Sequence, residues 1–173
     1  MLKIKLITII TLVILLCACN TQEQSTQLAQ IKAENKIRVG TLASASNYYQ
    51  AVQGEQGFEF ELSQAFADYL GVELEIVPFF NLSDMFERLE SGDLDLIASG
   101  LTYNKVRAQQ YRYGPTYRTI SQKLVYKQGR VRPREFDDLD GNFTVIAKSS
   151  HSLTLQKIKK SNPDLTWQET EEL

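Results

Sequence analysis

Thr102 and Arg107, in one short loop, are the side chains whose types and spacing best fit the binding of an anion. A guanidinium offers a rigid fork of N–H donors that matches a carboxylate, and a nearby hydroxyl adds a further hydrogen bond. Both residues follow the apolar run Leu94 to Ala98, which is typical of a strand buried in a parallel sheet. Ligands of open α/β sheets bind beyond the carboxyl ends of the strands, so the pattern predicts an anion-recognising loop in a small-molecule cleft. An ordinary βα turn with a solvated Arg107 fits the spacing equally well.

A second polar loop, Lys148 to His151, follows another short apolar run. Ser149 or Ser150 can cap the helix predicted after it, and the exposed N–H groups of a helix start bind an anion as readily as a cap. Three tyrosines surround the Gly114-Pro115 turn, at positions 111, 113 and 117. Their flat rings with polar tips could line a cleft or simply pack as a loop.

The sequence contains no recognisable catalytic constellation. His151 is the single histidine, and no strained Ser elbow accompanies it. Glu59 and Glu61 form a pair of carboxylates, but we expect them to be solvated or to form salt bridges rather than act as acid and base. Both cysteines, Cys17 and Cys19, lie in the amino-terminal segment, which leaves no thiol for a nucleophile or a metal site in the domain. We therefore predict no catalytic residue, no metal and no cofactor.

Length and composition indicate one globular domain with a substantial core. The chain has 173 residues, of which 43% are hydrophobic and 23% charged. No basic stripe is evident, so we expect no nucleic-acid partner. Loss of Lys3 and Lys5 with the amino-terminal segment would leave 17 basic and 21 acidic residues, a formal charge of −4, which favours solubility.

The amino terminus has the features of an export signal. Two lysines precede an apolar core, Ile4 to Leu16, which is too short for a comfortable membrane span. The core ends in Leu16-Cys17-Ala18-Cys19, which resembles the lipobox of bacterial lipoproteins and implies a signal peptide over 1–19 with Cys19 acylated. Plain secretory cleavage with a free Cys19 is the alternative. Asn20 in place of Asp implies, by the same resemblance, the periplasmic face of the outer membrane, and we expect a flexible tether over 20–34.

The domain begins with a β-α-β-α-β pattern. Strands are expected at Lys36–Thr41, Val72–Pro78 and Leu94–Ala98, with helices between them that start near Gly57 and Asn81. Right-handed crossovers then give a parallel sheet with helices on its faces. The first helix is expected to bury Leu62, Ala65, Phe66, Tyr69 and Leu70, and the second Leu82, Met85, Phe86 and Leu89.

Less of the second half is patterned. A strand at Ser121–Tyr126 is expected to lead into a basic crossing segment, and a smaller strand–helix–strand unit follows. Its strands are predicted at Phe143–Ala147 and Leu165–Trp167, and its helix should bury Leu155 and Ile158.

Several of these stretches resemble the family 3 extracellular solute-binding proteins. They are Gly57-Phe58-Glu59-Phe60-Glu61-Leu62, Gly92-Asp93-Leu94-Asp95, and Gly100-Leu101-Thr102 with Arg107. The resemblance implies a two-lobed α/β fold of the periplasmic-binding-protein type (type II, Venus-flytrap) that binds amino acids. It also implies that Arg107 holds the ligand carboxylate, that Thr102 assists, and that Ser149 and Ser150 contribute from the second lobe. The candidate ligand-binding residues are Arg107, Thr102, Gly100, Tyr48, Ser149 and Ser150.

A longer set of stretches resembles the solute-binding domain of the membrane-bound lytic murein transglycosylases. These include Phe66 to Val72, Gly114 to Tyr117, Ser121 to Tyr126 and Arg132-Pro133-Arg134. The resemblance implies a lipid-anchored regulatory domain acting in peptidoglycan turnover, with an amino acid or muropeptide-like ligand. An amino-acid-binding protein of an importer is the alternative. We expect lobe 1 at 35–126, a crossing segment at 127–142 and an incomplete lobe 2 at 143–173, without the lysozyme-like catalytic domain that would contact peptidoglycan in that family.

One departure from the solute-binding family bears on the ligand. Asn104-Lys105-Val106 stands where solute binders usually have Thr-Pro-Glu or a similar run, so ligand preference does not carry over.

Overall fold

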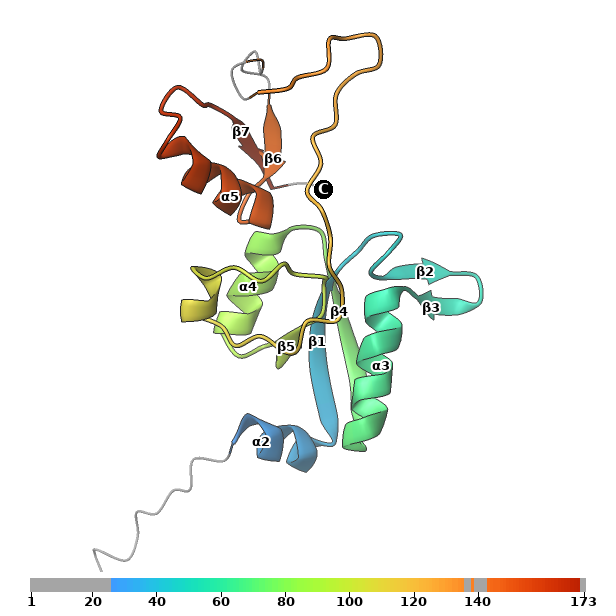
Figure 1. Ribbon diagram of the computed structural model, residues 1–173. Helices are drawn as coiled ribbons and strands as arrows, with labels where there is room; N and C mark the ends of the chain where they lie inside the picture. Colours follow the sequence, from blue (N-terminus) through green and yellow to red (C-terminus); the bar gives the residue numbers. More distant parts are fainter. Residues whose placement is uncertain (1–25, 136–137, 139–142, 172–173) are drawn as a thin grey trace, which may run out of the picture.

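The computed structural model describes residues 26–135, 138 and 143–171, which form two units joined by a long crossing segment (Figure 1). The larger unit contains α2 (Gln27–Glu34), β1 (Lys36–Leu42), β2 (Tyr49–Ala51), β3 (Gly54–Gln56), α3 (Phe58–Leu70), β4 (Glu73–Phe79), α4 (Leu82–Glu90), β5 (Leu96–Ile97) and the 3₁₀ helix η1 (Arg107–Gln109). The smaller unit contains β6 (Thr144–Ile146), α5 (Ser150–Lys159) and β7 (Gln168–Thr170). The predicted signal peptide and Cys19 lie outside the described residues.

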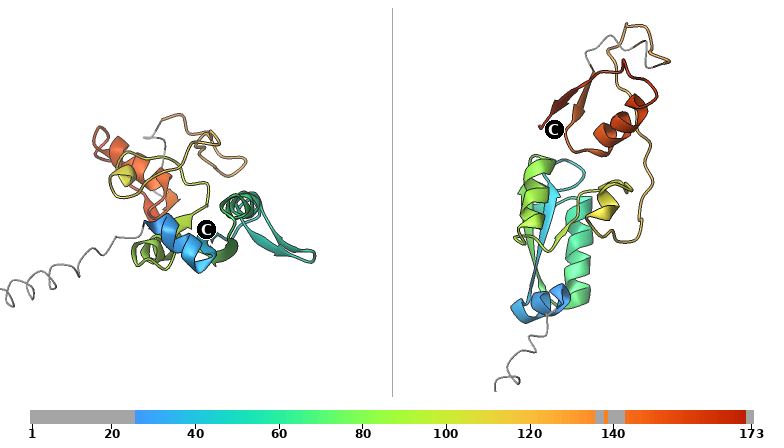
Figure 2. Two further views of the ribbon diagram at one scale, coloured as in Figure 1. Left: turned by 90° about the horizontal axis from the view of Figure 1, so that it is seen from below. Right: turned by 90° about the vertical axis from the view of Figure 1, so that its left-hand side faces the viewer.

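The larger unit is built on the predicted parallel sheet, with strand order β4-β1-β5. Val39 on the central strand lies beside Ile76 of β4 and Leu96 of β5. Alternate residues of β1 face opposite sides. Ile37 and Val39 therefore pack in one core cluster with Ala67 of α3, whereas Leu42 packs in another with α4. The β-α-β-α-β prediction is confirmed, and Figure 2 shows α3 and α4 on opposite faces of the sheet.

Helix α4 follows its predicted pattern closely. The Asn81 side chain accepts a hydrogen bond from the Asp84 N–H at 2.8 Å, which caps the helix start. Leu82, Met85 and Phe86 are buried as expected. The helix lies close to the sheet at Gly40, where an added Cβ would lie 3.3 Å from Met85 Cγ of α4 and 2.6 Å from Leu94 Cδ1. A side chain at this position of β1 would therefore force the Leu94 side chain to shift.

The predicted buried face of α3 is wrong. Its buried residues are Glu59, Ser63 and Ala67, one turn apart along the helix. Ser63 and Ala67 are small and let the helix lie close to β1. In consequence, the apolar side chains on the adjoining face point outward. Leu62 is 42% exposed, Phe66 43% and Tyr69 84%. Ala65 is also exposed, and Leu70 is the one residue of the predicted set that is partly buried.

Three further segments differ from the sequence-based expectation. Residues 27–34, placed in the tether, form α2, because Thr26 caps its start and Ile31 packs against the sheet. Residues 49–56, for which no strand was expected, form the hairpin β2–β3. The predicted strand Ser121–Tyr126 is absent: its residues are exposed and pair with no strand in the described chain, and a strand needs a partner for its backbone groups.

The smaller unit is a parallel β6–β7 pair covered by α5. The Ser149 hydroxyl accepts from the Ser152 N–H at 3.2 Å and caps α5, as predicted. Leu155 is buried against the strands and Ile158 is partly buried. The last strand lies at Gln168–Thr170 rather than at the predicted Leu165–Trp167, because residues 144–146 pair there in register with 168–170. No described helix is long and apolar enough to cross a membrane.

Met85→Ala should lower the free energy of unfolding by about 2–5 kcal/mol, because it removes a fully buried side chain and leaves a cavity between α4 and the sheet. Urea unfolding followed by circular dichroism measures the change. Phe80→Ala is the matched control, since Phe80 is 76% exposed and its removal should change the value by less than about 0.5 kcal/mol. Equal losses in the two variants would contradict the packing described here.

Candidate functional site

Arg107 is held in place at its backbone N–H and at its guanidinium. The Asn104 side chain accepts hydrogen bonds from the Val106 N–H (2.8 Å) and the Arg107 N–H (3.4 Å), which fixes the turn that opens η1. The guanidinium carbon lies 4.9 Å from the centre of the Phe86 ring, within the range of a cation–π contact. Asn104, part of the departure from the family pattern, thus supports the arginine that the family pattern predicts.

The guanidinium of Arg107 reaches the smaller unit. Its Nη2 donates to the backbone carbonyl of Lys148 at 2.5 Å, across 41 residues of sequence. The whole residue is only 7% exposed, yet no carboxylate in the described chain lies within salt-bridge distance of it. A buried cation without a counter-ion is unfavourable, and the remaining N–H groups of the guanidinium can still hold an anion. The solvated turn residue allowed by the sequence is therefore not what the structure contains.

Ser149 and Ser150 lie directly beside this contact, at the start of α5. The Ser149 hydroxyl accepts the capping bond from the Ser152 N–H, and the Ser149 N–H donates to the Ile146 carbonyl at 3.3 Å. The Ser150 hydroxyl accepts a hydrogen bond of 3.4 Å from the side-chain amide of Gln122, in the exposed stretch before the crossing segment. The structure thus brings both predicted serines next to Arg107 through Lys148, with Ser150 the more accessible of the two.

Gly100 and Thr102 lie on the loop between β5 and Arg107. Gly100 has a φ of +59°, which L residues rarely adopt, so a side chain there would be strained. An added Cβ would lie 3.3 Å from Arg118 Nη2 and 3.4 Å from Glu59 Oε1, so space is tight but not closed. The Thr102 hydroxyl has no hydrogen-bond partner in the described part of the chain and is half-buried, so it remains available to a ligand.

Tyr48 is placed differently from the other candidates. Its hydroxyl donates to Glu55 Oε1 of the hairpin at 2.7 Å, and its ring packs edge-on against Phe60 at 6.1 Å. That hydrogen bond, with partial burial, raises the pKa of Tyr48. No described contact joins Tyr48 to Arg107, so a ligand-binding role for Tyr48 stays a prediction.

The structure also contains a buried polar cluster that the sequence did not indicate. Glu59, expected to be solvated or paired, is 1% exposed, and the single Tyr117 O–H donates to its carboxylate, whose oxygens lie 2.8 and 3.0 Å from the phenol oxygen. The Phe58 ring packs against the Tyr117 ring at 5.9 Å and under the Arg118 guanidinium at 5.7 Å. Burial, followed by the bond to Glu59, raises the pKa of Tyr117 to about 12. The cluster ties the start of the crossing segment to α3.

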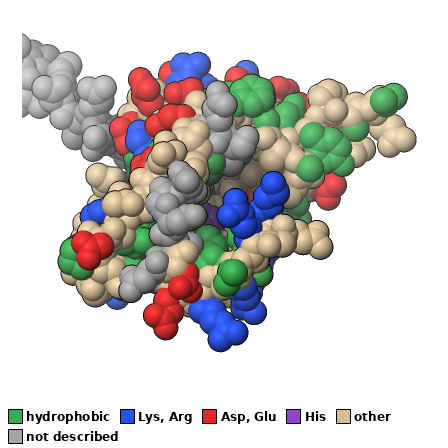
Figure 3. All heavy atoms as spheres, turned by 90° about the horizontal axis from the view of Figure 1, so that it is seen from above, with side chains coloured by type: hydrophobic (Ala, Val, Ile, Leu, Met, Phe, Trp, Pro, Cys, Tyr) green, Lys and Arg blue, Asp and Glu red, His purple; other side chains and the backbone are tan. Residues whose placement is uncertain are grey.

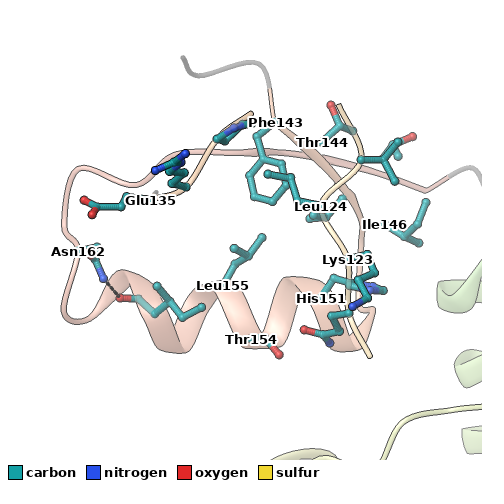
Figure 4. A pocket seen from close by; sticks show the side chains of 17 residues that line it. Lys123, Leu124, Glu135, Phe143, Thr144, Ile146, His151, Thr154, Leu155 and Asn162 are labelled. Atoms are coloured by element: carbon teal, nitrogen blue, oxygen red, sulfur yellow. Dashed lines mark hydrogen bonds between the residues drawn. The ribbon is translucent and has the colours of Figure 1, made fainter. Parts of the chain in front are cut away.

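A hollow of the described chain lies elsewhere, between the smaller unit and residues 122–125 and 133–135. It measures about 1030 Å³, and Figure 4 shows Phe143, Leu155 and Ile146 around it, with Lys123 and His151 at one end. Lys and Arg side chains gather beside His151 on the face seen in Figure 3. The lining of the hollow is mainly apolar, whereas Arg107 offers a fixed charge and N–H donors that no described group accepts from. We therefore take the surroundings of Arg107 as the candidate site.

The fold agrees with a comparison of the chain with known families. Residues 37–170 match the model of the bacterial extracellular solute-binding proteins, family 3, and the chain belongs to that family. The solved structures it resembles include an ancestral arginine-binding protein bound to arginine (TM-score 0.69, 26% identity, 80% of this chain and 62% of the other) and an ancestral amino acid-binding protein (TM-score 0.69, 27% identity, 85% and 66%). The architecture is a partial periplasmic-binding-protein-like α/β fold.

Curated relatives carry a more particular name, membrane-bound lytic murein transglycosylase F. One from Pseudoalteromonas translucida is 87% identical over 99% of this chain and 37% of its own length. Another, from Yersinia enterocolitica, is 45% identical over 83% of this chain and 30% of its own length. The chain thus spans about a third of the length of these relatives, and the resemblance to their solute-binding domain is confirmed.

Tyr117→Phe should lower the free energy of unfolding at neutral pH by about 1 kcal/mol, because the buried Glu59 carboxylate loses its hydrogen-bond donor. The expected loss is modest because Tyr117 itself is half exposed. The folded-state pKa, about 12, is above the ordinary value of 10.0, so the stability contributed by this phenol is present below pH 10 and is lost as pH rises toward 12. The difference between wild type and variant should therefore shrink between about pH 10 and 12.

Urea unfolding at a series of pH values measures this difference. Tyr126→Phe is the control, since Tyr126 is exposed and has no described hydrogen bond. A Tyr117→Phe variant as stable as wild type at neutral pH would mean that the Glu59 contact contributes nothing.

Proposed function

We propose that this chain is a ligand-binding, regulatory part of a lipid-anchored lytic murein transglycosylase at the periplasmic face of the outer membrane. Its ligand would be an amino acid or a muropeptide-like molecule, with its carboxylate on Arg107. The observation that carries the proposal is the buried Arg107 guanidinium, which has no counter-ion among the described residues and lies where the two units meet. The names of the long relatives support the enzyme context, and the names of the solved neighbours support an amino acid as ligand.

The chemistry of the site follows from its donors. Arg107 would bind a carboxylate through the N–H groups not given to Lys148, and the unpartnered Thr102 hydroxyl would add a hydrogen bond. Because the guanidinium also contacts the smaller unit, ligand binding there would bias how the two units are held. In the proposed parent enzyme, a lysozyme-like domain would cleave the MurNAc–GlcNAc bond without water, and occupancy of this site would report the presence of cell-wall fragments.

An amino-acid-binding protein of an importer is the second candidate, favoured by the solved neighbours named for arginine and amino acid binding. The coding sequence downstream of residue 173 separates the two. A lysozyme-like domain with a helix-borne Glu supports the transglycosylase, whereas a stop soon after one completed lobe supports the importer.

Arg107→Ala should weaken binding of a carboxylate ligand by roughly 30-fold to several thousand-fold, since truncating one partner of a buried charged pair costs about 2–5 kcal/mol. Arg107→Lys should lose much of the affinity, because lysine keeps the charge but not the fork. Thr102→Val should cost about 1 kcal/mol, as one neutral hydrogen bond.

Calorimetry on the complete protein in detergent, against amino acids and stem peptides, measures these changes. Tyr103→Phe is the control variant, because the Tyr103 hydroxyl has no described hydrogen bond and the residue is 59% exposed. A ligand that binds Arg107→Ala within about twofold of wild type would refute the assignment of Arg107.

Cys19→Ala should release the protein from the membrane fraction, because lipid attached to Cys19 is the only proposed anchor. Fractionation of cells with a salt wash, followed by immunoblotting, measures the distribution. Cys17→Ala is the matched control and should remain in the membrane fraction, since Cys17 would leave with the signal peptide. If Cys19→Ala still sediments with outer membranes, the lipobox assignment fails.

A further inference from the structure

Lys148 has a backbone conformation that its residue type does not favour. Two non-glycine residues of the described chain have a positive φ, Asn35 at +53° and Lys148 at +54°. Asn35 caps the end of α2, a position that asparagine tolerates well. Lys148 carries a Cβ and a long side chain, so glycine would adopt this conformation more easily. Such residues cluster at ligand clamps and switch regions, where the surroundings hold them in place.

The position of Lys148 relates it directly to the candidate site. Its carbonyl accepts the 2.5 Å hydrogen bond from Arg107, and the next residue, Ser149, caps α5. This bond uses one of the five N–H donors of the guanidinium. A carboxylate on the remaining donors would therefore lie beside the Lys148 residue, at the positive end of the helix dipole.

The ammonium of Lys148 is free to act on a ligand. The residue is exposed and forms no salt bridge with the described part of the chain. The acidic residue on the neighbouring strand, Glu169, is hydrogen-bonded to Ser152 at 2.5 Å and to Trp167 at 3.1 Å. Its carboxylate is thus already engaged by these two donors.

We propose that Lys148 is a specificity-determining residue that makes the site prefer a ligand with two carboxylates. Arg107 would hold the first carboxylate and Lys148 would attract the second. The ligand class is then an acidic amino acid or a peptide with an acidic residue at its end. This inference rests on the proposed function of Arg107 and adds to it the charge of the ligand.

Matched probes test the inference, because each pair differs by one charge at nearly constant size. The pairs are L-glutamate with L-glutamine, and L-Ala-γ-D-glutamate with its α-amide. Calorimetry on the complete protein in detergent gives the affinity ratio within each pair. We expect wild type to favour the dianion about two- to fivefold, the range for an exposed charge pair, and the ratio to fall at high salt.

Three substitutions separate charge from backbone strain. Lys148→Gly and Lys148→Gln should both bring the ratio close to one, whereas Lys148→Arg should keep it. Lys148→Gly should also melt at or above the wild-type temperature, because glycine relieves the left-handed conformation. Lys157→Gln, which removes an exposed lysine from the last turn of α5, is the control and should leave the ratio unchanged.

The outcomes distinguish this inference from the proposed function. If Arg107→Ala abolishes binding but Lys148→Gly leaves the ratio as in wild type, the role of Lys148 is refuted and that of Arg107 stands. A wild-type ratio at or below one has the same meaning. If no probe binds, or if probes bind independently of Arg107, the proposed function and this inference both fail.

Discussion

The rest of the structure depends on a buried guanidinium that has no carboxylate to neutralise it. Arg107 is 7% exposed, lies over the Phe86 ring and donates to a backbone carbonyl of the other unit. A carbonyl satisfies one N–H but supplies no counter-charge, so the arrangement favours an anionic guest. The loop from β5, the capping turn at Asn104 and the start of α5 all converge on this one side chain.

A second polar contact sets where the chain leaves the larger unit. Glu59 is buried at the start of α3, and Tyr117 binds both of its carboxylate oxygens just before the exposed crossing segment. Phe58 packs against both Tyr117 and Arg118. Gly100 lies against the same cluster, so the ligand loop and the crossing segment share one support. A change of conformation at the crossing segment would therefore be felt at the loop that carries Thr102 and Arg107.

The two units also meet away from Arg107, which makes their junction more than a single hydrogen bond. The Ser83 hydroxyl at the start of α4 donates to Glu171 at 2.6 Å, and Ile146 of β6 packs against the core cluster of the larger unit. Ser83 follows the end of β4 and Arg107 follows the end of β5. Both therefore come after the carboxyl ends of parallel strands, where ligands bind in open α/β folds.

The sequence by itself determined the parallel sheet, the cap at Asn81, the buried face of α4 and the loop with Thr102 and Arg107. Each of these follows from local chemistry: apolar periods, a capping side chain, or a donor placed after a buried strand. The apolar stripe of α3 was misassigned for an equally physical reason. Periodicity shows that a helix has an apolar face but not which face meets the sheet, and small residues at Ser63 and Ala67 allowed the closer approach.

Contacts between distant residues could be decided only by the tertiary structure. The partners of Glu59 and Arg107 lie 58 and 41 residues away in sequence, and no local pattern links them. The predicted strand at Ser121–Tyr126 did not form, because a strand needs a partner that satisfies its backbone groups and a local pattern does not show whether one is present. Residue types thus indicated which functional groups this chain has, while burial and long-range pairing decided which of those residues came together.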